Sequence, residues 1–290
     1  MTFEAQDELA RFRSMALAEG IPQDEVERWI ATARPCAKLE SRSDGPVAGR
    51  LGGPLMLPAD APDPWCGLAA TVDLAALPEE ATDLPLPTDG QLLLFAIPDP
   101  QLMGCQSLGS ALYIPAGTPV EERQVDLDPA PCDGEDYGEF PEGRLRLETD
   151  LSLPFHSTVH DPGPPPVTMR FPGDHLTVDQ CRAWGDMFME WADESQGLFS
   201  PGLRIGGYAQ DEYQDEDPAV MAGWEAARAE SKGDLPASEA DIRPENWVCL
   251  AQWSHAIEGL EMSFFSWSIA RQDLAAGRFD RVYATMTWNP

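Results

Sequence analysis

The sequence WVCLAQWS at residues 247–254, followed by EMSFFSWSI at 261–269, ARQDLAAG at 270–277 and RFDRVYATMTW at 278–288, decides the fold of this chain. In the second of these segments Phe265, Trp267 and Ile269 alternate with serines, and the last segment alternates in the same way. Such alternation, rich in aromatic and β-branched residues, predicts half-buried strands. Between them we expect a short helix capped by Ser268 and ended by Gly277. This stretch has the densest aromatic content of the chain and is the predicted main core.

Part of this pattern occurs earlier in the chain. Residues 65–69 (WCGLA) and 247–251 (WVCLA) share W-x-x-L-A, and each is preceded by a Gly-Gly signature, RLGG at 50–53 and RIGG at 204–207. An apolar strand opened by a glycine follows each copy, after Gly90 and Gly259. Three matches in one order predict an internal duplication, with halves of about 35–160 and 161–290, against the alternative of chance similarity. We therefore expect Trp65 to match Trp247 and Gly53 to match Gly207.

The composition sets limits on the class of protein. With 290 residues, 43% of them hydrophobic, the chain can bury a large core, and 28 prolines favour many short elements joined by turns. It opens with MTFEAQDELARFR, without a basic segment followed by an apolar one, and no apolar run is long enough for a bilayer, so we expect a cytoplasmic protein. The net charge of −31 argues against nucleic acid and anionic membranes and suits a basic protein partner, although solubility explains it equally well.

The pattern along the chain predicts an α+β fold: a mainly antiparallel, roll-like β core with internal duplication and peripheral helices. Residues 1–34 predict an N-terminal helical hairpin packed on this core, and residues 35–290 the duplicated domain. A helix begins at Thr177 with a Thr-x-x-Gln capping box. Another begins at Asp217-Pro218 and ends near Gly233, where the first half has only a loop, and therefore looks like an insertion.

The sequence reveals no reaction. Nucleophile and phosphate-loop motifs are absent, and the Gly-Gly pairs are interpreted as tight turns that need positive φ. The six cysteines are scattered, so reduced thiols are expected, and prolines flank His156 and His160, whose i,i+4 spacing would otherwise suit zinc on a helix. We therefore assign no catalytic residue, no metal and no cofactor.

Two groups of residues are candidate binding sites. An acidic run beside the second Gly-Gly turn is the candidate partner-binding surface: Asp211, Glu212, Asp215, Glu216 and Asp217. The alternative is that these residues form only a solvated loop and the start of a helix. A second group could line a ligand groove between the duplicated halves: Gln210, Gln252, Trp253 and His255.

The order of several short motifs resembles the bacterial YwqG-like family, a domain of unknown function. The resemblance rests on LGGP at 51–54, GQLLLF at 90–95, IGGY at 205–208 and WVCLAQ at 247–252, and it covers roughly residues 35–288. It implies a mainly β, roll-like α+β fold with internal duplication. Some members are encoded beside secreted toxins, which implies immunity as one role. The first copy of the family pattern usually has Gln where Ala70 stands here, and acids often stand where this chain has Ser254 and His255.

Three functions follow from these observations. The first is a cytosolic acidic binding protein, such as an immunity or accessory protein for a basic secreted toxin. The second is a small-molecule binding module with a groove between the halves, and the third is an enzyme with a nonstandard site around Gln210, Gln252 and His255.

Overall fold

One antiparallel sheet, strongly curled, organises the protein. The computed structural model describes residues 3–125, 140–161, 167–196, 202–211, 215–240, 242–254, 257–260 and 262–288. The ten strands of the main sheet lie in the order β14-β13-β12-β11-β1-β8-β2-β4-β5-β6. Their bounds are β1 Arg34–Glu40, β2 Val47–Leu51, β4 Gly67–Asp73, β5 Gln91–Ala96, β6 Gly109–Ile114, β8 Gly143–Ser152, β11 Gly202–Gly206, β12 Trp247–Ser254, β13 Ser263–Ala270 and β14 Tyr283–Trp288. The α+β fold with a large antiparallel sheet is confirmed.

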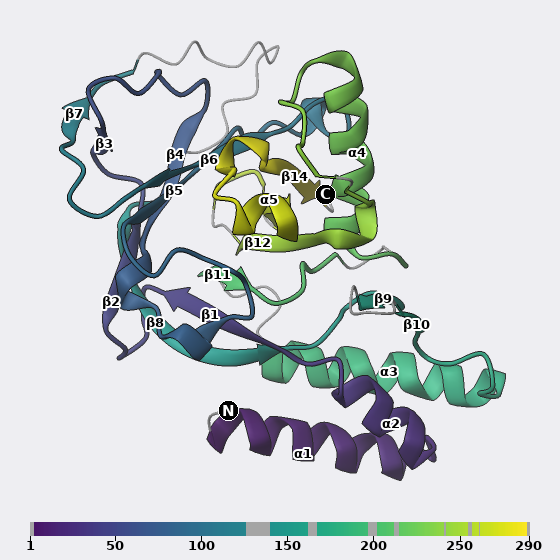
Figure 1. Cartoon of the computed structure of the whole chain (residues 1–290). Helices are drawn as coiled ribbons and strands as arrows, with labels where there is room; N and C mark the ends of the chain where they lie inside the picture. Colours follow the sequence, from purple (N-terminus) through teal and green to yellow (C-terminus); the bar gives the residue numbers. More distant parts are fainter. Residues whose placement is uncertain are drawn as a thin grey trace.

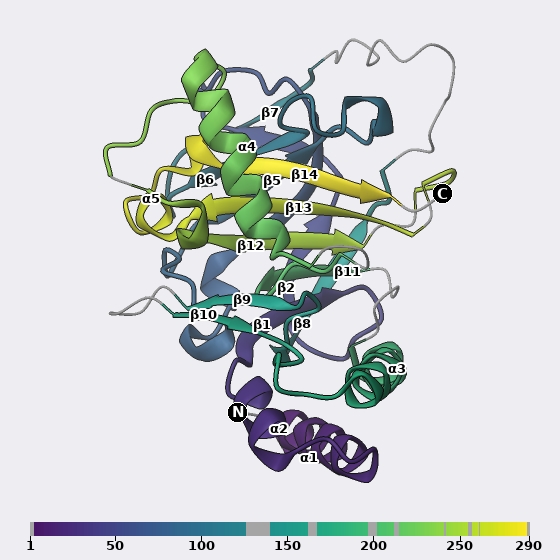
Figure 2. The same ribbon diagram turned by 90° about the vertical axis from the view of Figure 1, so that its right-hand side faces the viewer.

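Two small ribbons and five helices surround this sheet among the described residues. The ribbons pair β3 with β7 and β9 with β10; the first three helices lie at one end of the sheet and the fourth lies against its outer face (Figures 1 and 2). Their bounds are β3 Leu55–Leu57, β7 Glu121–Arg123, β9 Thr158–Asp161, β10 Val167–Arg170, α1 Phe3–Ala18, α2 Gln23–Ile30, α3 Val178–Gln196, α4 Pro218–Lys232 and α5 Arg271–Ala275. No helix of the described residues has both the length and the apolar character needed to cross a membrane.

The strand order repeats about the central pair β1·β8. On one side β11, β12, β13 and β14 follow β1, and on the other side β2, β4, β5 and β6 follow β8. The order along the chain is β1-β2-β4-β5-β6 and then β8-β11-β12-β13-β14, so the first strand of each series lies beside the second strand of the other series. The two series therefore exchange their first strands.

The register of the sheet corrects the predicted match of Trp65 with Trp247. Leu51 lies opposite Ala70 in β2·β4, and Ile205 lies opposite Ala251 in β11·β12. When the two Gly-Gly turns are matched, the counterpart of Trp247 is thus Cys66, one residue beyond Trp65. The two W-x-x-L-A segments lie in equivalent strands, but one position out of step. The same register makes Thr71, and not Ala70, the counterpart of Gln252.

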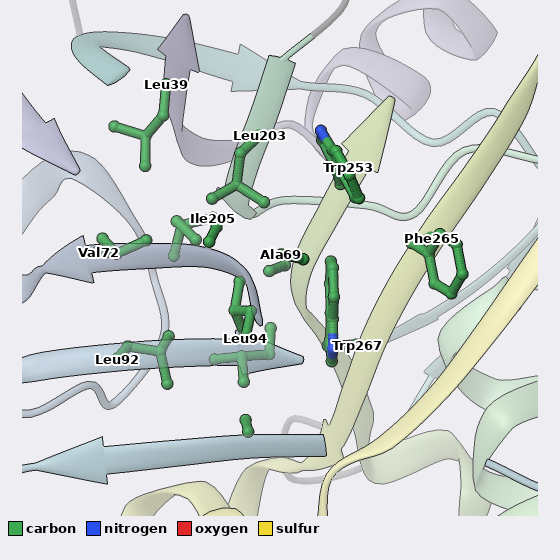
Figure 3. Packing of buried hydrophobic residues seen from close by; sticks show 14 of the residues in the cluster. Leu39, Ala69, Val72, Leu92, Leu94, Leu203, Ile205, Trp253, Phe265 and Trp267 are labelled. Atoms are coloured by element: carbon green, nitrogen blue, oxygen red, sulfur yellow. The ribbon is translucent and has the colours of Figure 1, made fainter. Parts of the chain in front are cut away.

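The interior of the curl holds one continuous apolar cluster drawn from both series of strands. Figure 3 shows Leu92 and Leu94 of β5 facing the same cluster as Leu203 of β11 and Trp267 of β13. The Trp267 indole Nε1 donates a hydrogen bond to the Phe95 carbonyl oxygen at 2.9 Å, which ties the two series together across the interior. The edges also meet, because Leu108 N donates to the Ala284 carbonyl at 2.9 Å and Ala284 N donates to Ser107 Oγ at 3.0 Å. The sheet therefore nearly closes.

The alternation in β13 predicted a half-buried strand, and this is wrong. Every residue of β13 is buried, including Ser266 and Ser268. The outer face is covered because α4 lies across β12, β13 and β14 (Figure 2). Ser268 is a strand residue and caps no helix; the residue before α5 is Ala270, which makes no side-chain cap, although Gly277 does adopt the expected positive φ of 71°.

The N-terminal helices form a second aromatic cluster with α3. Phe12 of α1 stacks on Trp29 of α2 at 4.2 Å between ring centroids, and both rings contact Trp184 and Trp191 of α3. The capping box of α3 is confirmed, since Thr177 N donates to Gln180 Oε1 and Gln180 N donates to Thr177 Oγ1. These helices lie at the end of the sheet remote from α4 (Figure 2).

Candidate functional site

Gln252 anchors the segment that leads from the sheet to α4. Its Oε1 accepts hydrogen bonds from Arg204 Nη2 at 2.9 Å and from Gln210 N at 3.0 Å. Its Nε2 donates to the Gln210 carbonyl and to Ser266 Oγ, both at 2.9 Å. The side chain is 2% exposed and its amide makes four hydrogen bonds, which is its full capacity. Gln210 and Gln252, predicted as ligand-groove residues, thus lie together in a buried structural junction.

The second Gly-Gly turn sends the chain away from the sheet. Gly206 and Gly207 both have φ of 74°, as the sequence interpretation required. A Cβ on Gly207 would lie 2.5 Å from Ser152 Cβ, so a larger residue would displace β8. Directly after it, Tyr208 N donates to Ser152 Oγ and the Tyr208 hydroxyl donates to the Thr32 carbonyl. The path of residues 208–211 is therefore fixed on both sides.

The predicted acidic run continues this segment, and most of its described members face the protein. Asp211 is buried, and Asp217 is buried at the start of α4, where its Oδ1 accepts from Ala219 N at 2.9 Å as the N-cap. Glu216 Oε1 lies 2.7 Å from Nε2 of His160. Asp215 is exposed, and Glu212 lies outside the described residues. The structure thus places the predicted partner surface mainly in the joint between β9 and α4.

Trp253 points into the interior of the curled sheet. Its side chain is 1% exposed and packs edge-on against Phe140 at 5.6 Å, on the face of β12 opposite to Gln252. Trp253 therefore belongs to the main core, which Figure 3 shows. His255 lies outside the described residues.

A groove lies beside Asp211, where the two series of strands meet beneath α4. We call it the seam groove; it consists of two neighbouring cavities of about 440 and 200 Å³. Gly104, Gln106 and Glu225 line both cavities. The larger one is further lined by Trp65, Cys105, Ser107, Arg228, Ala229, Lys232, Asp234, Leu235 and Tyr283, and the smaller one by Met103, Leu108, Asp211, Pro218, Met221, Ala222, Thr285, Met286 and Thr287.

Glu225 is the titratable group at the centre of the seam groove. Burial raises the pKa of its carboxyl above the ordinary value, while Arg228 and a hydrogen bond with Tyr283 act in the opposite direction. Burial, together with Glu225, likewise raises the pKa of the Tyr283 hydroxyl to about 12. A carboxylate that is partly removed from water gains more from a cation than an exposed one does. Glu225 is therefore suited to receive a positive charge.

Large apolar side chains are exposed along the rim of this groove. Trp65 and Met221, which line the groove, are 50% and 40% exposed, and Trp224, the residue before Glu225 on α4, is 52% exposed. Exposed Trp and Met side chains beside a concave surface are typical of protein-binding and ligand-binding sites. The sequence analysis did not identify Glu225 and Tyr283 as site residues. A signal was available, because Met221 and Trp224 are large apolar residues among hydrophilic ones on the inserted helix, which is the pattern of an exposed binding face.

Several buried titratable residues lie outside the seam groove. Burial raises the pKa of the Cys36 thiol to about 11 and that of Cys249 to about 12, so both stay protonated. Within the described residues no group of three or more His, Cys, Asp or Glu side chains could hold a metal ion. His156 is 3% exposed and its ring meets that of Tyr208 edge-on, with its Nε2 3.7 Å from Asp217 Oδ2.

The fold and the groove define a class: an antiparallel α+β protein with a curled, internally repeated sheet and a cleft where the repeats meet. The family model described as Domain of unknown function (DUF1963) matches residues 49–288, so the chain belongs to this family. No curated protein sequence matches the chain.

Proposed function

We propose that this chain is a binding protein that holds a basic partner protein at the seam groove. The observation that carries the proposal is the combination in this groove of exposed Trp65 and Met221 with the partly buried carboxyl of Glu225. Exposed Trp224 precedes Glu225 on α4 and extends the apolar surface of this helix. Aromatic residues and Met are enriched at protein interfaces, where a few residues, often Trp, carry most of the binding energy. Complementary charge contributes to partner choice and association rate. The net charge of −31 attracts a basic partner over long range.

Within this proposal, the finer role is that of a YwqG-like bacterial immunity or accessory protein for a basic secreted toxin, acting in the cytoplasm. The acidic run contributes through Asp215, whose side chain is exposed at the approach to α4. Because Asp211 and Asp217 are buried, they act on α4 and the groove and do not form an open acidic surface.

Affinity capture tests this function. The wild-type protein and a Met221→Ser/Trp224→Ala double variant are used as baits in lysate of the native host at about 50 mM and about 500 mM salt. Both substituted side chains are largely exposed, so the variant should keep the thermal unfolding midpoint of the wild type. We expect a basic protein that only the wild type retains, and less of it at high salt. Equal capture by both baits, or an acidic partner, would contradict the proposal.

A small-molecule function is the second candidate, because the larger cavity, at about 440 Å³, lies in the size range of small-molecule sites, roughly 300–1,000 Å³. Its lining combines Trp65 and Tyr283 with charges of both signs from Glu225, Arg228 and Lys232. Native mass spectrometry of the protein purified from its host distinguishes the candidates: a co-purifying mass below that of a peptide, absent from Trp65→Ala, would favour this one.

A further inference from the structure

The smaller cavity of the seam groove has walls suited to an aliphatic chain. Met103 and Leu108 precede β6, Met221 comes from α4 and Met286 from β14, so apolar side chains of both series of strands enclose a volume of about 200 Å³. Methionine side chains are flexible and polarisable, and they adapt to different apolar guests. A cavity of this size holds one long side chain and is too small for a helix.

The charged residues at this cavity are all of one sign. Among its described lining residues the charged ones are Asp211 and Glu225, and Asp211 is only 8% exposed. The larger cavity differs, since Arg228 and Lys232 line it together with Glu225 and Asp234. Anionic guests are therefore disfavoured in the smaller cavity, and a cation that enters it meets two carboxyl groups in surroundings of low dielectric constant.

An apolar wall with a carboxylate at its end fits a cation on an aliphatic stem. Lysine and arginine bury their methylene groups along apolar surfaces while the charged end remains paired or hydrated. A bare metal ion fits less well, because methionine and leucine side chains take up much of the wall and the described residues contain no group of three metal-ligating side chains.

We propose that the smaller cavity takes the side chain of one lysine or arginine of the basic partner, with its stem against Met103, Met221 and Met286 and its cation at Glu225 and Asp211. This inference rests on the proposed function and names the group that the site recognises. Burial raises the pKa of Glu225, opposed by Arg228 and by the hydrogen bond with Tyr283, and a cationic guest favours the ionised carboxylate. Binding should therefore strengthen as the pH rises above the ordinary carboxyl range.

Methionine methyl NMR with short peptides tests the inference. The probes are blocked pentapeptides of glycine with a central lysine, arginine, Nε-acetyl-lysine or norleucine, added to protein that carries labelled methionine methyl groups. We expect the lysine or the arginine peptide to shift the signals of Met103, Met221 and Met286, and the two uncharged peptides to bind about tenfold or more weakly. The relative affinity of the lysine and arginine peptides then identifies the preferred cation.

Two variants separate recognition in the cavity from general attraction to an acidic protein. Glu225→Gln should weaken the cationic peptide about tenfold or more, whereas Glu19→Gln removes the same charge at an exposed place in the remote N-terminal hairpin and should leave binding unchanged. Equal affinity of both variants, equal binding of the norleucine peptide, or no methyl shift with any peptide would overturn the cavity assignment. In each of these cases, salt-sensitive capture of a basic protein by the wild-type chain would still support the proposed function. If the capture assay finds no basic partner, the proposed function and the cavity assignment both fail.

Discussion

At the scale of single residues, two neighbouring arginines show how burial decides the value of an ion pair. Arg281 is 2% exposed; its Nε donates to Asp273 Oδ2 at 2.6 Å and its Nη2 to Glu230 Oε2 at 2.9 Å. It thereby joins α4 to α5. Arg278 instead pairs with Asp280 at the surface, at 2.9 Å.

We therefore predict that Arg281→Met lowers the free energy of unfolding by about 3–5 kcal/mol, because the carboxylate of Asp273 then remains buried without its cation. Arg278→Met is the matched control and should change stability little, because water can hydrate the exposed carboxylate of Asp280 once the arginine is gone. Chemical denaturation of both variants measures the difference. Similar losses for the two would show that the buried pair has no special role.

His156 predicts how stability depends on pH. Burial lowers the pKa of its imidazole, opposed by Asp217 and Glu216 and assisted by Arg34 and His160, while the ring of Tyr208 packs against it. In the unfolded chain the His156 imidazole takes up a proton as the pH falls through about 6.5, whereas in the folded protein the same ring stays neutral to a lower pH. The stability that comes from the neutral ring is present above this pH and is lost as the pH falls toward the folded pKa.

Comparing the wild type with His156→Phe between about pH 8 and about pH 5 isolates this contribution. We expect the stability of the wild type relative to the variant to fall with acidification. His175→Phe serves as control, because the His175 side chain is 56% exposed, and it should leave the pH profile unchanged. A stability difference between wild type and His156→Phe that is constant over this range would contradict the prediction.

Residue identities predicted the turns better than the register. The Gly-Gly pairs were assigned positive φ from glycine's freedom alone, and Gly52, Gly53, Gly206 and Gly207 all have it. The W-x-x-L-A match, in contrast, is one position out of step, because pairing with the neighbouring strand sets the register. The β-bulges show the same offset: the unpaired residue is Ala69 in β4 and Leu250 in β12.

At the scale of elements, α4 forms one wall of the seam groove, and its ends were predictable from caps. Asp217 at the N-cap and Gly233, with φ of 84°, at the C-terminal end are local signals, so both bounds were read correctly. A groove between the halves was expected, but the residues that line the seam groove were not predictable. The groove joins residues 103–108, α4 and β14, and only the near-closure of the sheet brings these segments together.

The N-cap of α4 should therefore matter for both stability and binding. We predict that Asp217→Ala lowers the free energy of unfolding by about 1 kcal/mol and weakens capture of the basic partner, because the first turn of α4 carries Met221. Asp217→Asn keeps a good cap and should retain most of both properties. Urea unfolding and the capture assay measure the two effects. If the alanine variant matches the asparagine variant in both, the cap does not position α4.

At the scale of the whole molecule, the exchange of first strands makes the two halves depend on each other. β8 pairs with β2 and β1, and β1 pairs with β11, so strands far apart in the chain complete each half of the sheet. The sequence predicted the repeated strands but not this exchange, because periodicity identifies a strand and says nothing about its neighbour. The main interior cluster also takes residues from both halves, so neither half completes it alone, although two smaller clusters each lie within one half.

A protein cut between residues 126 and 139 tests this dependence. Each fragment then lacks one strand of the central pair β1·β8, and the inner faces of its remaining strands lose their apolar partners. We expect neither fragment alone to give a cooperative thermal transition, and the two co-expressed fragments to assemble and melt together. The control is the same cut in Trp267→Phe, which removes the hydrogen bond to the Phe95 carbonyl between the halves and should weaken reassembly further. A first fragment that melts cooperatively as a monomer would mean that β1 has taken the place of β8 beside β2, and that a half can fold alone.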